Sequence, residues 1–145
     1  MMFDKEFWNK EENVNTNNCY TYAIDRPFTR NGHLLKFETS PVLSCKAISY
    51  IIDQDGVIPT ESNGKCKDDY HKIFIAIGPD SDFNFYREHN DGSWAHKRGY
   101  DPISQVDSVG NVIKEPVKAS KNYSSAWGMV GDDYSESCGV YCAKN

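Results

Sequence analysis

The feature that most constrains the fold is a run of branched and aromatic residues at 72–78, which Pro79 closes. The run is too short for a typical helix, and side chains of this kind favour a pleated, half-buried surface, so it predicts a buried strand. Two further strand-like segments, 82–88 and 93–97, flank the residues 90–92. These contain Asp-Gly, a strong signal for a tight hairpin turn. The sequence therefore predicts an antiparallel sheet around the run.

Two helices are expected to pack on this sheet. Asn18 can cap a short helix that begins at Cys19. Ser40 and Pro41 offer an N-cap and a first-turn proline for a longer helix, which Gly56 ends. The apolar residues of the longer helix recur at three- and four-residue spacing, which places them on one face: Val42, Ala47, Ile48, Ile51 and Ile52.

Length and composition predict one domain over residues 1–145. A chain of 145 residues buries about 70% of its surface on folding. Hydrophobic residues make up 39% and aromatic residues 13%, which is enough bulky apolar material for one core. The segment 139–142 predicts a closing strand, whereas 100–123 is loop-like. We predict an α+β fold in which helices pack on a small antiparallel sheet.

Charge and hydropathy exclude two classes of partner. The formal net charge is −5 and no run of Lys or Arg exceeds two, so nucleic acid is not an expected partner. No apolar run approaches the length of a membrane span, so no membrane partner is expected. The first residues lack the basic start and apolar stretch of a secretory signal, which predicts a protein that is cytoplasmic or exported without a classical leader.

Five cysteines are an odd number, so at least one is free or pairs with another chain. Without a secretory signal, reduced thiols are the default expectation. In an exported, toxin-like or effector-like protein, Cys45, Cys66, Cys138 and Cys142 could instead form two disulfides and leave Cys19 free.

Cys19 is the candidate nucleophile because it opens a helix. The aligned peptide dipoles favour a thiolate at that position. The backbone N–H groups of the same turn can also receive an oxyanion. The alternative is a small buried hydrophobic residue on a core-facing helix.

Two histidines are candidates for the general base. His71 stands just before the predicted buried strand, where a rigid sheet would hold its imidazole. His96 lies on the hairpin and could orient His71 or act as the base itself. His33 and His89 fall in turn-rich stretches and are expected to be solvated.

These residues carry a resemblance. The arrangement resembles the NlpC-type and CHAP-type papain-like cysteine peptidases: Cys19 begins a helix, His71 precedes a strand, and a further polar residue lies on the next strands. More closely, NCYTYA at 18–23, DFNFYR at 82–87 and DGSWAHK at 91–97 resemble a little-characterised bacterial group with NCYxYA and WxHK motifs. In that group a histidine stands where this chain has Asn84, which argues against an essential role for that position.

The resemblance implies a papain-like fold and hydrolysis of an amide or peptide through a thioester. Cys19 would be the nucleophile, His71 the base and His96 the orienting residue. The substrate would be a peptide or amide, with no cofactor and no metal.

Two other interpretations stay open. Cys66, His71, Cys138 and Cys142 could form a zinc site, although their spacing does not match a compact paired-cysteine knuckle. The chain could also be a non-catalytic binding or effector module, because fold does not determine function.

Overall fold

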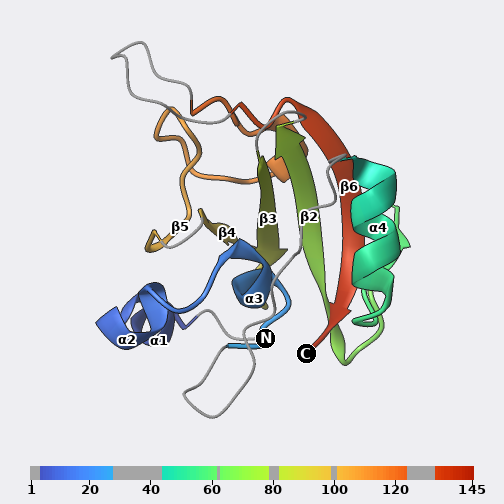
Figure 1. Ribbon diagram of the computed structural model, residues 1–145, viewed down its shortest axis with the longest axis horizontal. Helices are drawn as coiled ribbons and strands as arrows, with labels where there is room; N and C mark the ends of the chain where they lie inside the picture. The colour runs from blue at the N-terminus through green and yellow to red at the C-terminus, as the bar shows by residue number, and fades with distance from the viewer. Residues whose placement is uncertain (1–3, 28–43, 62, 79–81, 99–100, 124–132) are drawn as a thin grey trace.

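The computed structural model describes residues 4–27, 44–61, 63–78, 82–98, 101–123 and 133–145 (Figure 1). The described residues form a six-stranded antiparallel sheet of order β1-β6-β2-β3-β4-β5. Its strands are β1 (Ile58–Thr60), β2 (Tyr70–Gly78), β3 (Asp82–Glu88), β4 (Trp94–Lys97), β5 (Ile103–Ser104) and β6 (Glu136–Lys144). The helices are α1 (Lys5–Asn9), α2 (Glu11–Val14), α3 (Cys19–Ala23), α4 (Cys45–Asp53) and the 3-10 turn η1 (Pro116–Lys118). An α+β fold with a small antiparallel sheet is thus confirmed.

The strands predicted around the apolar run are all present. β2 pairs with β3 on one side and with β6 on the other. The hairpin at Asp91-Gly92 joins β3 to β4, and Gly92 has the positive φ of 83° that such a turn requires. β6 is longer than the predicted 139–142, and it lies between β1 and β2 (Figure 1).

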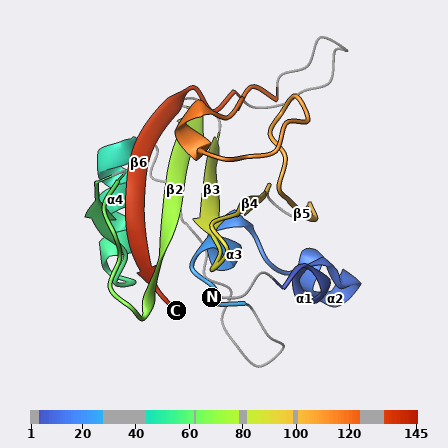
Figure 2. The same ribbon diagram turned by 180° about the vertical axis from the view of Figure 1, so that it is seen from behind.

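The sheet has one face covered by helices and one covered by an irregular segment. α3 and α4 lie against the first face (Figure 1), and the chain from 105 to 123 crosses the other (Figure 2). Alternate residues of β2 supply the two cores, because successive side chains of a strand point to opposite faces. Ile73 and Ile75 pack with the helices, whereas Phe74 and Ala76 pack beneath the irregular segment.

α4 begins later than the sequence predicts. Ser44 has an extended backbone, and its Oγ accepts a hydrogen bond from the Ala47 N–H at 3.1 Å, so Ser44 is the N-cap. A helix cannot continue through an extended residue, so the predicted start at Ser40 and Pro41 is wrong. Those two residues lie outside the described part of the chain.

Two helices at the start of the chain were not predicted. The segment 5–18 is polar and rich in Asn, a residue that favours turns, yet α1 and α2 form there. The Asp4 side chain caps α1 by accepting from the Phe7 N–H at 3.0 Å. Trp8 is 1% exposed and packs edge-on against Tyr22 of α3. An aromatic anchor therefore ties this polar segment to the core.

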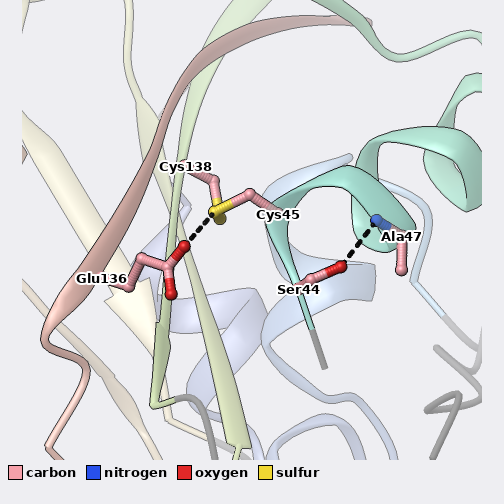
Figure 3. Close-up of a disulfide and its surroundings, with 5 residues drawn as sticks. All are labelled: Ser44, Cys45, Ala47, Glu136 and Cys138. Carbon is pink, nitrogen blue, oxygen red and sulfur yellow. Dashed lines mark hydrogen bonds between the residues drawn. A yellow bond between two sulfur atoms is a disulfide. The ribbon is translucent and has the colours of Figure 1, made fainter. Parts of the chain in front are cut away.

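Two disulfides correct the expectation of reduced thiols. Cys45 of α4 is bonded to Cys138 of β6 beside Glu136 (Figure 3), and Cys66 is bonded to Cys142. The Cα–Cα distances are 5.2 and 5.7 Å, within the usual range for a disulfide. The zinc interpretation is wrong for the same reason: zinc binds cysteine as a thiolate, and the sulfur atoms of Cys66, Cys138 and Cys142 are all in disulfides. Cys19 is the free cysteine.

No helix among the described residues is both long enough and apolar enough to cross a membrane.

Candidate functional site

Cys19 opens α3 as the sequence predicts, and the helix start is well capped. Asn18 Oδ1 accepts from the Thr21 N–H at 2.9 Å, and the Asn18 N–H donates to Thr21 Oγ1 at 3.0 Å. The Cys19 side chain, however, is 4% exposed. Its Sγ lies 3.9 Å from the carbonyl oxygen of Phe83 on β3. The sulfur therefore faces the sheet rather than an open cleft.

His71 lies at the other end of α3. Its Nε2 is 2.6 Å from the carbonyl oxygen of Ala23, the last residue of the helix that Cys19 begins. Its Nδ1 is 2.7 Å from Asn145 Oδ1. Because a carbonyl oxygen only accepts, Nε2 must carry a proton. Burial lowers the pKa of His71, against the hydrogen bonds to Ala23 and Asn145, which raise it, and both ring nitrogens are engaged.

His96 lies on the face of the sheet opposite Cys19. It stacks on Tyr86 with ring centroids 4.7 Å apart. Its Nε2 donates to the Val106 carbonyl at 3.1 Å, and its Nδ1 accepts from Asn84 Nδ2 at 3.0 Å. Burial lowers the pKa of His96 to about 4. Neither ring nitrogen contacts His71.

The structure thus separates the three residues of the predicted site. His71 contacts the C-terminal end of α3, Cys19 begins that helix, and His96 is beyond the sheet. A catalytic set of Cys19, His71 and His96 stays a prediction, and the observed hydrogen bonds do not assemble it.

A lysine is the charged neighbour of Cys19. Lys97 is fully buried, and its Nζ donates to the carbonyl oxygens of Val14 at 2.7 Å and Asn17 at 2.5 Å. Burial lowers the pKa of Lys97 to about 8, against an opposing interaction with Cys19 that raises it. Sequence reasoning missed this residue. The signal was the alternation along β4, which sends Lys97 to the face opposite His96.

His89 is buried, which makes the prediction of a solvated side chain wrong. It is 3% exposed, and its Nε2 lies 3.0 Å from the Tyr22 hydroxyl and accepts from Arg87 Nε at 3.2 Å. Arg87 also pairs with Asp25 at 3.1 Å. Burial, followed by the charge of Arg87, lowers the pKa of His89 to about 4. His33 lies outside the described residues.

Two hollows open on the face of the sheet away from α3 and α4. A groove of about 500 Å³ runs over Phe74, Trp94 and Val140. Its rim carries charges of both signs from Lys72, Glu88, Lys114 and Glu115. A smaller hollow of about 240 Å³ has walls that include His96, Arg98 and Tyr123.

Fold and site together define a disulfide-cross-linked α+β module with one buried thiol. No protein-family model matches the chain, and no solved structure matches it significantly. The chain is similar to insoluble matrix shell protein 1 of Ruditapes philippinarum, with 27% identity over 135 residues. The match covers 89% of this chain and 88% of that protein, so it spans nearly the whole of both.

Proposed function

We propose that this chain is a non-catalytic binding module of an extracellular matrix, stabilised by its disulfides. The observation that carries the proposal is the placement of the cysteines. Both ends of β6 are cross-linked through Cys138 and Cys142, while the remaining thiol, Cys19, is buried. Disulfides persist in oxidising compartments, which favours an extracellular location. A relative named as an insoluble shell matrix protein supports the same kind of role.

The groove over β2 and β4 is the surface that we assign to binding. Phe74 and Trp94 lie beneath the groove and are almost fully buried, at 2% and 6% exposure, and the groove volume of about 500 Å³ lies within the range of about 300–1,000 Å³ typical of ligand sites. The two lysines and two glutamates of the rim balance in charge. A rim with balanced charges suits an uncharged, hydroxyl-rich chain, because the hydroxyl groups of such a chain meet both donors and acceptors. We therefore propose an insoluble polysaccharide as the partner.

Sedimentation with insoluble polysaccharide particles tests this assignment. Val117 lines the groove and is 58% exposed, so Val117→Asp changes the surface without disturbing the core. We expect it to reduce the sedimented fraction several-fold. Val109→Asp is the matched control, because Val109 is 67% exposed and is not among the residues that line the groove. A wild-type protein that stays in the supernatant, or a Val117→Asp variant that binds as well as the control, would refute the proposal.

The second candidate is a cysteine amide hydrolase on a papain-like fold. It is favoured by Cys19 at a capped helix start within the field of the buried Lys97 ammonium, since both features favour a thiolate. The thiolate would attack an amide carbon, form a thioester and release the amine, and water would then release the acid. Peptide hydrolysis that Cys19→Ala abolishes would establish this function in place of the first.

A further inference from the structure

Three buried polar atoms without a hydrogen-bond partner gather around His96. Among the described residues these atoms are Asn84 Oδ1, Tyr86 OH and Arg98 Nε. Asn84 donates to the His96 ring, and Tyr86 stacks on it. Arg98 lies over Tyr123, whose hydroxyl is 3.5 Å from His96 Nε2. A buried polar group left unpaired costs about 1–3 kcal/mol, and of these three residues Arg98 is the one that lines the 240 Å³ hollow, so its guanidinium is the group that a ligand in the hollow would contact.

Arg98 gives this cluster its charge. Its guanidinium carbon lies 3.6 Å from the centroid of the Tyr123 ring, which fixes the plane of the group at the wall of the 240 Å³ hollow. The ion pairs between described residues join Arg87 to Asp25 and Lys118 to Glu115, so Arg98 has no carboxylate partner within that part of the chain. A planar guanidinium in that state is suited to a carboxylate, which it binds through two parallel hydrogen bonds.

The nearby acidic residues do not fill that role. Asp107 lines the hollow, but its carboxylate accepts from the N–H groups of Val109, Asn111 and Ser120 at 3.0, 3.0 and 3.2 Å. It therefore holds its own loop together. Asp101 also lines the hollow and is exposed. Two acidic side chains at the wall disfavour a doubly charged anion more than a singly charged one.

We propose that this hollow binds a small monocarboxylate, with Arg98 holding the carboxylate and Tyr123 holding the guanidinium in place. His96 forms a neutral part of the wall, because its Nδ1 accepts from Asn84 Nδ2 and so carries no proton. The volume of about 240 Å³ limits the ligand to a small molecule. This inference is independent of the polysaccharide groove, because the two hollows have no lining residue in common.

Titration with sodium acetate and sodium propionate, followed by NMR shifts of the Arg98 and His96 side chains, tests the proposal. At constant ionic strength we expect saturable shifts with both carboxylates. Inorganic phosphate should bind at least roughly tenfold more weakly than acetate. Arg98→Gln should abolish the shifts at His96. Lys118→Gln, which removes an exposed cation outside the hollow, should leave them unchanged.

A second variant keeps the test decisive if Arg98→Gln does not fold. Asp101→Asn removes an exposed negative charge from the wall, so it should tighten acetate binding and bring phosphate closer to acetate. Shifts that do not saturate, or that are unaffected by both the Arg98 and the Asp101 substitutions, would mean that solvent alone fills the hollow. Tighter binding of phosphate than of acetate by the wild-type protein would also overturn the assignment.

Discussion

The Nε2 atom of His71 lies 2.6 Å from the carbonyl oxygen of Ala23. The ring thus satisfies a carbonyl group at the C-terminal end of α3, where such groups lack partners within the helix. The other ring nitrogen of His71 contacts Asn145, so the side chain joins β2 both to α3 and to the end of the chain. In the structure His71 therefore ties β2 to α3, and its role as a base stays a prediction.

Removal of the Cys45–Cys138 disulfide should lower stability strongly. The bond closes a loop with a sequence separation of 93 residues, and in the chain-entropy model such a constraint on the unfolded state is worth roughly 2–5 kcal/mol. We expect a Cys45→Ala, Cys138→Ala double variant to lose that amount in urea unfolding. Intact mass should also rise by about two hydrogens per bridge on reduction of the wild-type protein. An unchanged free energy of unfolding, or an unchanged mass, would contradict the cross-linked frame.

Acid should destabilise the fold through its buried histidines. His89 and His96 have a pKa of about 4 in the folded protein, against about 6.5 in the unfolded chain. Between these values the unfolded chain binds more protons, so the free energy of unfolding is fully retained above pH 6.5 and falls as the pH drops towards 4. The expected loss near pH 4 is roughly 3 kcal/mol for each ring, or about 6 kcal/mol for the two together.

Urea unfolding measured across this pH range checks the slope, and His89→Gln separates the histidine effect from that of carboxylates. The variant removes one of the two titrating rings, so its free energy of unfolding should depend less steeply on pH. Equal slopes for the variant and the wild type would show that His89 is not buried in its neutral form.

Lys97 should be far more important for stability than an exposed lysine. In Lys97→Met the side chain keeps its apolar stem, but the carbonyl groups of Val14 and Asn17 lose their ammonium donor. We expect a loss of roughly 2–4 kcal/mol, because each buried carbonyl left unsatisfied costs about 1–3 kcal/mol. Lys118→Met is the control, since Lys118 is 77% exposed and should change stability by less than about 0.5 kcal/mol. Equal effects of the two substitutions would contradict this role.

The sequence predicted the elements whose signals are local. Branched residues define β2, Asp91-Gly92 defines the hairpin, and Asn18 caps α3. It could not predict that β6 inserts beside β2, because strand pairing between distant segments leaves no local pattern. The sequence offered two disulfides among these four cysteines as an alternative, but not which cysteine pairs with which, because the partners lie 93 and 76 residues apart and the fold brings them together.

The sequence says less about the candidate site than about the fold, for a physical reason. The order of a cysteine and two histidines along the chain says nothing about which face of the sheet each side chain takes. Alternation along β3 and β4 places Arg87 and Lys97 on the face of α3, and Asn84 and His96 on the other. His89 was assigned to solvent because it ends a strand beside a turn, yet Tyr22 and Arg87 enclose it.

Alkylation of the native protein by iodoacetamide at neutral pH, read by intact mass, tests whether Cys19 is buried in a non-catalytic module. Because Cys19 is buried and the other four cysteines are disulfide-bonded, we expect no rapid labelling of the folded protein. After unfolding without reductant, a single site should react. After reduction, the other four sites should react as well. Rapid and selective labelling of Cys19 in the folded protein would contradict a sealed, non-catalytic module and favour the hydrolase.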